Sequence, residues 1–338
     1  MHSFSINQAL DMHLHLRDEE MLKLVAPLTS NSFSGALIMP NLVPPITTKE
    51  ALLSYKQRIK EATSGDKFEA YVTLFFQNNY SYEFLEDIKA DIIAIKLYPA
   101  GITTNSQTGV SSMDVEVLRS TLEAMSKLNI PLCIHGETNG FVMDREKEFM
   151  PIYESIASAF PNLKIIMEHI TTKDAIELLD KYDNLYATVT LHHLLITLDD
   201  VAGGMLNPHL FCKPIAKRPE DRTALLNAAL SAHPKLMFGS DSAPHPKHKK
   251  ECCGCAAGVF TSPIALQVLT QVFDEHNCLE NLNKFVSLNA QSIYGINPPT
   301  KEIKLIKKEF TVPTSYKYNN EIVVPMYAGE KLSWSIEG

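Results

Sequence analysis

Short apolar segments alternate with longer amphipathic ones along most of the chain. Eight of the short segments have the length and residue types of β-strands, and several are apolar on both faces, which is typical of parallel strands buried between two layers. The predicted strands cover residues 11–16, 35–41, 69–76, 92–99, 131–137, 164–170, 185–194 and 235–241.

The amphipathic segments between these strands predict helices. The clearest cover residues 49–62, 113–128, 173–181, 220–232 and 262–275. Thr47 or Thr48 can cap the first of them, and Thr171 or Thr172 can cap the third, because a threonine hydroxyl accepts from the free N–H groups of a first helical turn. Eight strand–helix units in series predict an α/β fold of the TIM-type (β/α)8 barrel class, with a doubly wound parallel sheet as the alternative.

Two connections are too long for simple turns. Residues 100–112 and 196–219 both follow the carboxyl end of a predicted strand, where a barrel builds its active site. A further helix over 282–294 precedes a tail that alternates polar and apolar residues. We expect residues 1–338 to form one domain, with 299–338 as a small β-containing C-terminal extension packed on the barrel.

Composition excludes several classes of function. The chain has 338 residues, 45% of them hydrophobic, and its 31 basic and 39 acidic residues give a net charge of −8. An acidic chain without a basic run is a poor partner for nucleic acid or an anionic membrane, but it can bind a small molecule. No apolar run suits a membrane helix and no secretory signal is visible. The six cysteines do not indicate a disulfide framework, so we expect a cytoplasmic protein.

Histidines and carboxylates recur at the ends of the predicted strands. His13 and His15 are two residues apart in the first strand, so both rings can project from one face. His135, His169 and Asp241 lie near the ends of the fifth, sixth and eighth strands. Imidazole and carboxylate are good ligands for zinc and similar ions. The pattern therefore predicts a metal site at one rim of the barrel.

Lys96 is unusual because it lies inside an apolar strand, between Ile95 and Leu97. A lysine should not be buried there without a partner. One interpretation is an ion pair with Glu137 or Glu168. The other is a modified lysine, since an uncharged amine can add carbon dioxide and become a carbamate anion with two oxygens.

Taken together, these residues resemble a known family. The motifs occur in the family's order from about residue 11 to residue 298, and they are Asp11–Asp18 (DMHLHLRD), Met39–Asn41 with Pro44 and Pro45, Lys96–Ala100 (KLYPA), His135–Glu137, Glu168–Thr172 and Asp241–His245. They are similar to those of the dihydroorotases of the amidohydrolase superfamily, and most of all to the single-function bacterial class.

The resemblance implies a zinc-dependent hydrolase with two zinc ions per subunit. His13, His15 and Asp241 would bind one ion, His135 and His169 the other, and a carboxylated Lys96 would bridge them together with a hydroxide. The hydroxide would attack the ring amide carbonyl of dihydroorotate, with Asp241 acting as general base and then general acid. The ring would open to N-carbamoyl-aspartate. The reverse reaction is the third step of pyrimidine synthesis.

The resemblance also assigns residues to the substrate. Arg17, Asn41 and His245 would bind its carboxylate, and the backbone near Lys213 and Ala257 would contact the ring edge. The competing interpretation of Arg17 is a salt bridge at the rim with Asp18 or Glu19, and that of His245 is a solvated residue in a basic loop.

Thr103 and Thr104 would belong to a lid that closes over the substrate. The competing interpretation of this loop is an ordinary solvated segment. By analogy with the family we expect a homodimer.

Three rival functions remain at this point. A hydantoinase or allantoinase would use the same metal ligands on another ring, and a mononuclear deaminase would not need Lys96. A catalytically inactive scaffold barrel would typically have lost ligands, whereas all six candidate positions here hold usable side chains.

No role is predicted for His192, His193 or Cys253. The Cys-x-x-Cys of Cys252 and Cys255 is interpreted as loop packing, because no second pair completes a zinc site.

Overall fold

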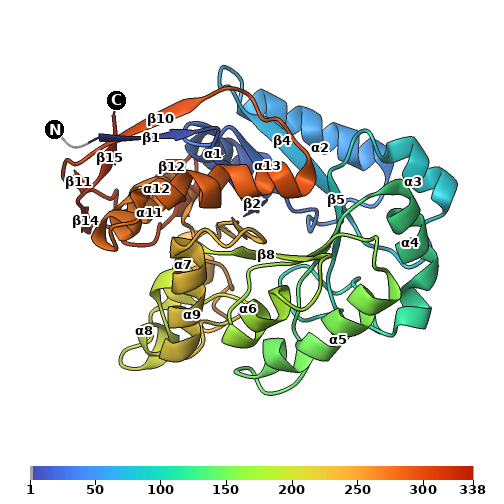
Figure 1. The fold of residues 1–338 in the computed structure, drawn as a ribbon. Coiled ribbons are helices and arrows are strands. Elements are labelled where there is room, and N and C mark those ends of the chain that lie inside the picture. The colour runs from blue at the N-terminus through green and yellow to red at the C-terminus, as the bar shows by residue number, and fades with distance from the viewer. Residues whose placement is uncertain (1–2, 338) are drawn as a thin grey trace.

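The computed structural model describes residues 3–337, so Met1, His2 and Gly338, which the predicted domain and its extension include, lie outside the described residues. Eight parallel strands form one sheet in the order in which they occur in the sequence (Figure 1). They are β2 (Leu10–Leu14), β3 (Gly35–Ile38), β4 (Glu69–Phe75), β5 (Ala94–Leu97), β6 (Leu132–Ile134), β7 (Ile165–Met167), β8 (Leu185–Val189) and β9 (Leu236–Phe238).

The sheet closes into a barrel where the segment after β9 meets the end of β2. The backbone N–H of Asp241 donates to the carbonyl of His13 at 2.8 Å, and the N–H of His15 donates to the carbonyl of Ser242 at 3.2 Å. The fold is therefore the predicted TIM-type (β/α)8 barrel, and the doubly wound sheet is excluded. All eight predicted strands are present, although most end two or three residues earlier than predicted.

Helices surround the barrel, as the amphipathic pattern predicted. The principal ones are α1 (Glu19–Ser30), α2 (Lys49–Ala62), α3 (Tyr82–Ile88), α4 (Val115–Leu128), α5 (Arg145–Ala159), α6 (Lys173–Leu179), α9 (Pro219–Leu230) and α11 (Ala265–Glu275). Thr48 caps α2 and Thr172 caps α6 through their side chains, so both predicted caps are confirmed.

A register irregularity in β2 positions the first histidines. The pairing of β2 with β3 shifts between Asp11 and Leu14, and such bulges re-aim side chains next to active sites. Met12 packs in the apolar barrel interior with Leu10, whereas the rings of His13 and His15 both reach Asp241. The bulge thus separates the apolar floor of the barrel from its polar mouth.

The seventh predicted strand is too long. It ends at Val189, and residues Leu191–Leu195 form the short helix α7. Thr190 starts this helix, because its hydroxyl accepts from the backbone N–H of His193 at 3.0 Å.

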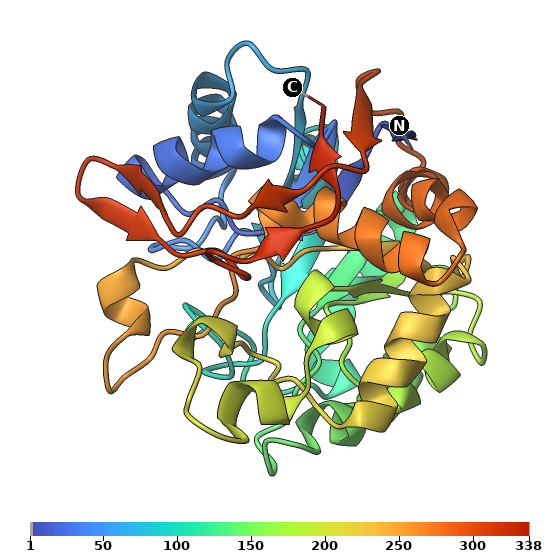
Figure 2. The ribbon, with the colours of Figure 1, turned by 90° about the vertical axis from the view of Figure 1, so that its left-hand side faces the viewer.

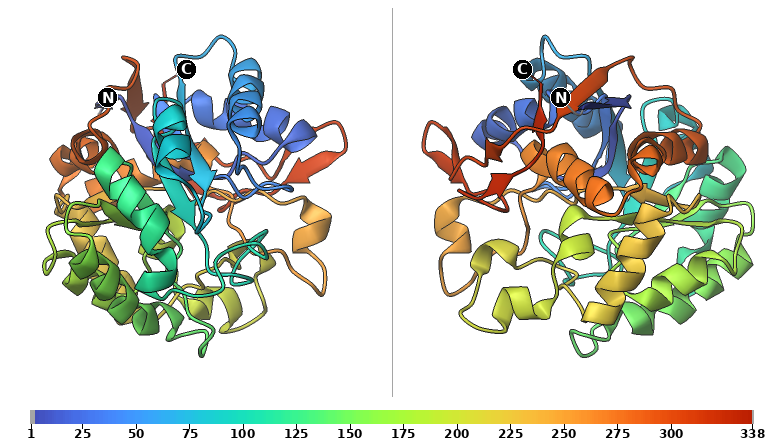
Figure 3. Two further views of the ribbon diagram at one scale, coloured as in Figure 1. Left: turned by 90° about the vertical axis from the view of Figure 1, so that its right-hand side faces the viewer. Right: turned by 60° about the vertical axis from the view of Figure 1, so that its left-hand side comes forward.

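The two long connections remain largely irregular. Residues 100–112 contain no helix or strand, and 196–219 contains α8 (Leu198–Ala202) and the 3₁₀ turn η1 (Pro208–Leu210). Figure 3 shows that these loops and the short α10 (Lys247–Lys250) gather on one side of the barrel. This side carries the carboxyl ends of the strands, as predicted for an active site.

The predicted helix 282–294 is divided into α12 (Leu279–Asn283), a π-helical turn η3 (Lys284–Leu288) and α13 (Asn289–Tyr294). A 3₁₀ turn, η2 (Ser262–Ile264), leads into α11. Within residues 3–337, no helix combines the length and the apolar content that crossing a membrane requires.

Short antiparallel strands make up the C-terminal extension. β10 (Glu302–Ile306) pairs with β1 (Ser3–Asn7) and β15 (Ser335–Ile336), β11 (Phe310–Thr311) with β14 (Lys331–Leu332), and β12 (Tyr316–Tyr318) with β13 (Glu321–Val323). β1 lies outside the predicted extension, over 299–338, and joins it by pairing with β10. Figure 2 shows the C-terminal strands beside α1, and β12 and β13 contact this helix.

Trp334 attaches this extension to the barrel helices. Its side chain is 1% exposed, and its indole N–H donates to Asp274 of α11 at 3.2 Å. We expect Trp334→Ala to lower the free energy of unfolding by about 3–5 kcal/mol, because the change leaves a large cavity. Tyr318→Ala, at a 38% exposed position of the same extension, should cost less than about 1 kcal/mol.

Urea denaturation followed by circular dichroism measures both variants. Trp334 is the single tryptophan of the chain, so its fluorescence in the unchanged protein reports on the extension alone. Coincident fluorescence and dichroism transitions are expected if the extension and barrel form one domain. A fluorescence transition at clearly lower urea would contradict the single-domain prediction.

Candidate active site

The first group of chemically active side chains lies where the barrel closes. Asp241 Oδ1 lies 3.0 Å from His15 Nε2 and 3.5 Å from His13 Nε2. The backbone hydrogen bonds of the closure hold the three residues at this spacing. Asp11 strengthens the closure, because its carboxylate accepts from the backbone N–H of Ser240 at 2.7 Å and from the Ser240 hydroxyl at 2.5 Å.

The second group comes from the neighbouring strands β6 and β7. His135 Nδ1 lies 3.1 Å from His169 Nε2. The ring centroids of His169 and His13 are 4.9 Å apart, so the second group adjoins the first. The structure therefore brings His13, His15, His135, His169 and Asp241 together, as the sequence predicted.

Two of these residues have an uncommon backbone conformation. His169 has φ +41° and Asp241 has φ +42°, values that non-glycine residues seldom adopt. Hydrogen bonds hold both in place, since the N–H of His169 donates to the Thr188 hydroxyl at 2.8 Å and that of Asp241 to the His13 carbonyl. Strain retained in this way is typical of functional sites.

Lys96 lies on β5 and is fully buried. Its Nζ has no hydrogen-bond partner among the described residues and lies 5.0 Å from the centre of the Tyr98 ring. Burial lowers the pKa of its ammonium, against the opposing attraction of Glu168. The predicted ion pair with Glu137 or Glu168 is not formed within residues 3–337.

Those two glutamates hold histidines instead. Glu168 Oε2 lies 2.7 Å from His13 Nδ1 and accepts from Thr188 at 2.6 Å, and Glu137 Oε2 lies 2.7 Å from His135 Nε2. Burial alone raises the pKa of a carboxyl, yet the attraction of His13 and Lys96 lowers that of Glu168 to about 2. Each carboxylate therefore fixes which nitrogen of its histidine faces the site.

These residues fit a divalent metal ion. The ligand atoms of His13, His15 and Asp241 lie within 4.8 Å of one another. Burial lowers the pKa of His15 and His169 well below its usual value, so these two rings are neutral and offer lone pairs, and burial also lowers the pKa of His13 against the opposing attraction of Glu168. Lys96 Nζ is a further polar atom at this site, and it has no hydrogen-bond partner among the described side chains.

A cavity opens over this group. It is lined by three kinds of residue: the candidate ligands, the candidate substrate contacts and the loop threonines. They are His13, His15, His135, His169, Asp241, Arg17, Asn41, Lys213, Ala257, Thr103 and Thr104, together with Tyr98, Ala243 and Gly258. All the sequence-predicted site residues except Lys96 and His245 therefore face one space.

Arg17 projects its guanidinium toward this cavity. Its Nε donates to the Pro244 carbonyl at 3.1 Å, and a terminal nitrogen lies 3.1 Å from His245 Nε2. The predicted alternative, a salt bridge to Asp18, is wrong because Asp18 pairs with Arg58 at 2.7 Å. His245 lies behind Arg17 and is partly buried, so it is not a solvated loop residue.

The loop 100–112 is joined to the cavity wall. Asn41 Nδ2 donates to the Thr104 carbonyl at 3.0 Å, and Asn105 Nδ2 donates back to the Asn41 carbonyl at 3.1 Å. The Lys213 ammonium donates to the Ile102 carbonyl at 3.2 Å. The solvated interpretation of this loop is therefore wrong, and Lys213 contributes its side chain as well as its backbone.

Sequence reasoning assigned no role to three further residues. Tyr98 and Gly258 line the cavity. A Cβ at Gly258 would meet the Ala243 carbonyl oxygen at 2.4 Å, so only glycine fits there. Lys250 is buried, and its ammonium donates to the carbonyls of Phe211, Ala256 and Gly258 at 3.0, 2.8 and 2.7 Å.

Only weak sequence signals could have found them. Tyr98 belongs to the KLYPA motif, but Lys250 ends a run of exposed basic residues and has the same local pattern as its neighbours.

Comparison with known proteins gives consistent results. The amidohydrolase family model matches residues 86–275. A dihydroorotase from Helicobacter pylori is 44% identical over 330 residues, which is 97% of each chain. The crystal structure of a Campylobacter jejuni dihydroorotase is 55% identical, with a TM-score of 0.96 over 99% of this chain and 98% of that one.

A Saccharomyces cerevisiae dihydroorotase, solved in complex with 5-fluoroorotic acid, is 36% identical, with a TM-score of 0.94 over 100% of this chain and 99% of that one. Similarity of this extent over the whole barrel, together with the geometry of its mouth, shows that the chain belongs to the dihydroorotase family of amidohydrolases.

Proposed function

We propose that this protein is a zinc-dependent dihydroorotase that reversibly opens the cyclic amide of dihydroorotate to N-carbamoyl-aspartate. One observation carries the proposal: Arg17 lines the same cavity as the clustered histidines and has no carboxylate partner among the described residues. The cavity thus combines candidate metal ligands with a guanidinium that pairs with no carboxylate of the described residues. This combination suits a cyclic amide that carries a carboxylate. Ring closure, the reverse direction, would then serve pyrimidine synthesis.

The residues would hold two zinc ions. His13, His15 and Asp241 would bind one, and His135 and His169 the other. When bound, the ions would polarise the ring carbonyl of the substrate and lower the pKa of water, which supplies the nucleophile. Glu168 and Glu137 would keep the ligating nitrogens of His13 and His135 unprotonated by accepting hydrogen bonds from their other nitrogens.

Lys96 would bridge the two ions as a carbamate. Its amine is buried without a partner, and its lowered pKa increases the fraction of the uncharged form. Addition of carbon dioxide to that amine releases one proton and gives an anion with two oxygen ligands. This modification would convert an unfavourable buried ammonium into a group that opposite charges can satisfy.

Asp241 would move the proton. It lies against His15 at the cavity floor, where burial raises the pKa of its carboxyl. It would accept the proton that water loses as it attacks the ring carbonyl. It would return this proton to the ring nitrogen as the carbon–nitrogen bond breaks, which avoids expulsion of an amide anion.

The cavity wall would select and enclose the substrate. Arg17, oriented by Pro244 and His245, would bind the carboxylate together with Asn41. Backbone groups of Lys213 and Ala257 would contact the ring edge, and Thr103 and Thr104 would reach it from the loop. The loop is joined to the wall by hydrogen bonds through Asn41 and Lys213, which a lid can break and re-form.

We further propose a cytoplasmic homodimer that acts on a small molecule and has no nucleic-acid or membrane partner. The excess of acidic over basic residues supports the absence of anionic polymer partners.

Substrate preference is the decisive measurement. The value of kcat/KM for dihydroorotate should exceed those for hydantoin and allantoin by roughly 100-fold or more, because only dihydroorotate can use Arg17. Arg17→Met should lower kcat/KM for dihydroorotate by about 10- to 100-fold, the effect of losing a charge-assisted hydrogen bond. Arg58→Met, whose arginine pairs with Asp18, is the matched control and should keep near-normal turnover.

Two results would contradict this function. If hydantoin or allantoin is turned over faster than dihydroorotate, the protein is a hydantoinase or an allantoinase and not a dihydroorotase. Absence of hydrolysis of all three compounds, in zinc-loaded and folded protein, would instead support the inactive scaffold.

Lys96 variants test the paired metal site. Lys96→Ala should lower the zinc content by at least one ion per chain and lower kcat by roughly 10²–10⁴-fold, because the bridging anion is lost. Elemental analysis and steady-state kinetics measure both. Carbon-13 NMR of protein equilibrated with labelled bicarbonate should show a carbamate signal that Lys96→Ala abolishes. One metal per chain in both proteins, with unchanged activity, would revive the mononuclear deaminase.

Lys250→Met tests a positioning role. Its ammonium serves three carbonyls in segments that line the cavity, so loss of the charge should displace these segments and lower kcat/KM by roughly 10- to 100-fold. Most of the loss should be in KM, with the zinc content unchanged, and Lys250→Arg should restore part of it. Lys249→Met, at an exposed neighbour, should have no such effect. An unchanged KM in folded Lys250→Met would exclude this role.

A further inference from the structure

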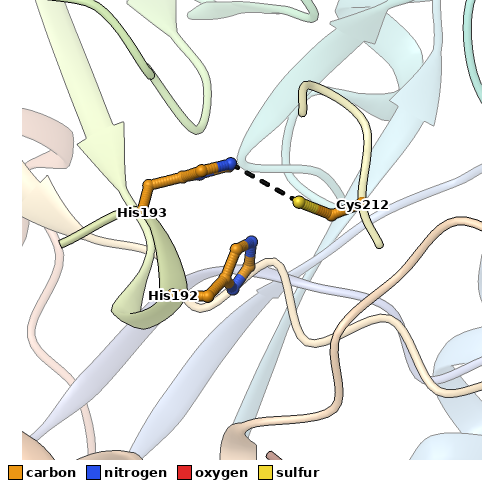
Figure 4. A group of neighbouring side chains, drawn as sticks. All are labelled: His192, His193 and Cys212. Carbon is orange, nitrogen blue, oxygen red and sulfur yellow. Dashed lines mark hydrogen bonds between the residues drawn. The ribbon is translucent and has the colours of Figure 1, made fainter. Parts of the chain in front are cut away.

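A second group of metal-ligating side chains lies outside the cavity. His192 and His193 come from the first turn of α7, and Cys212 comes from the segment after η1. The three residues are 0%, 2% and 1% exposed. Figure 4 shows that their side chains meet from two different segments. We refer to them as the His192–Cys212 cluster.

The spacing within this cluster suits tetrahedral coordination. Cys212 Sγ lies 3.6 Å from His193 Nε2, and one ligand atom from each of the three residues lies within 4.8 Å of the others. A tetrahedral zinc ion would place its thiolate and imidazole ligands roughly 3.6 Å apart, given bonds of about 2.3 and 2.0–2.1 Å. The Pro214 carbonyl oxygen lies 3.0 Å from His193 Nε2 and 3.2 Å from Cys212 Sγ, so a fourth donor is within reach.

His192 provides an independent observation. Both of its ring nitrogens are buried and have no hydrogen-bond partner among the described residues. A buried polar atom left in this way costs about 1–3 kcal/mol. Figure 4 shows one of these nitrogens directed toward the space between His193 and Cys212. A cation in that space would satisfy it.

Both histidines are already in the neutral form that metal binding requires. Burial lowers the pKa of His192 well below its usual value and that of His193 to about 4, so both rings are neutral at pH 7. His193 Nδ1 lies 2.9 Å from the Thr190 hydroxyl. In the structure Nε2 donates to the Pro214 carbonyl at 3.0 Å, so metal binding requires the other tautomer, in which Nδ1–H donates to the Thr190 hydroxyl and Nε2 binds the ion.

We propose that His192, His193 and Cys212 form a metal-binding site for Zn²⁺ or a similar thiophilic divalent cation, with the Pro214 carbonyl as the fourth donor. The Cys212 thiol loses its proton to solvent as its sulfur binds the ion, so each ion bound releases one proton. The site would join α7 to the segment that carries Lys213, one wall of the cavity. The proposal does not depend on the proposed function, because none of these three residues belongs to the cavity lining.

The Cys212–His193 pair does not suit nucleophilic or redox chemistry. Burial raises the pKa of the Cys212 thiol to about 12, so little thiolate forms at neutral pH without a cation. The described cysteines are all free, and Cys212 is fully buried. A metal is therefore the ligand class that the cluster favours.

Cobalt titration tests this site directly. Full-length protein, stripped of metal with a chelator, is titrated with Co²⁺ under reducing conditions and followed in the near-ultraviolet, where thiolate-to-cobalt charge transfer absorbs. The candidate ligands at the barrel mouth include no cysteine, so binding there gives no such band. At saturating Co²⁺ we expect a band with the intensity of one thiolate-bound ion per chain in the unchanged protein and no band in Cys212→Ser, whatever number of ions the barrel mouth binds.

Further variants separate this site from other thiols. The triple change Cys252→Ser, Cys253→Ser and Cys255→Ser should keep the band, and so should His13→Gln at the barrel mouth. His192→Gln should weaken Co²⁺ binding by about tenfold or more and lower the zinc content of the purified protein by one ion per chain.

Three results would overturn the proposal. They are no band in the unchanged protein at saturating Co²⁺, a band that persists in Cys212→Ser, or a band that the triple variant abolishes. If Cys212→Ser does not fold, the zinc content and Co²⁺ affinity of His192→Gln decide, and values equal to those of the unchanged protein would exclude the site.

Discussion

The closure of the barrel is the constraint on which the candidate site depends. Residues from the two ends of the barrel sequence meet only because the segment after β9 hydrogen bonds to the end of β2. Asp11 holds this junction from below through Ser240. Each bond contributes only about 1 kcal/mol, but together they fix Asp241 at 3.0 Å from His15 and oblige it to adopt a positive φ. A small slip at this junction would separate Asp241 from His13 and His15.

Closure also buries several polar groups side by side at the barrel mouth. Lys96 Nζ, His169 Nδ1 and Glu168 Oε1 are buried and have no hydrogen-bond partner within the described part of the chain. Each unsatisfied group costs about 1–3 kcal/mol, against a total stability of about 5–15 kcal/mol for a typical domain. Packing alone gives no reason to retain three such groups together. The proposed carbamate on Lys96 would remove the most costly of them, because it replaces a buried ammonium by an anion that cations can satisfy.

The sequence predicted the barrel and its ligands because both depend on local patterns. Buried parallel strands are apolar throughout, and a histidine or carboxylate at a strand end needs no knowledge of its neighbours to be noticed. The partners of Glu137 and Glu168 could not be predicted. Histidines and Lys96 occupy similar positions at the strand ends, and the pairing depends on the three-dimensional structure. The strand 185–194 was extended too far because Leu191–Leu195 is as apolar as a strand, and Thr190 redirects the chain through a single hydroxyl.

The walls of the cavity were harder to predict from the sequence than its floor, which is formed by the candidate metal ligands at the strand ends. The floor consists of side chains on strands, whereas the walls consist of backbone segments that distant side chains hold in place. Lys250 fixes the segments at Phe211 and Ala256–Gly258, and Gly258 permits an approach to Ala243 that any larger residue would prevent. Such contacts leave no periodic signal in the sequence.

Floor and walls also divide the chemistry between them. If the histidines hold cations as proposed, they would activate water toward many cyclic amides, so these strand-end residues would set the type of reaction but not the ring. Arg17, Lys213 and Gly258 lie on the walls of the cavity, where a substrate's substituents would lie. Substrate choice within this fold therefore depends on loops that the barrel only supports. Lys250 holds the Phe211–Pro214 segment at Phe211, and Cys212 and Pro214 connect it to α7 through His193, so one wall of the cavity rests on side chains outside the cavity lining.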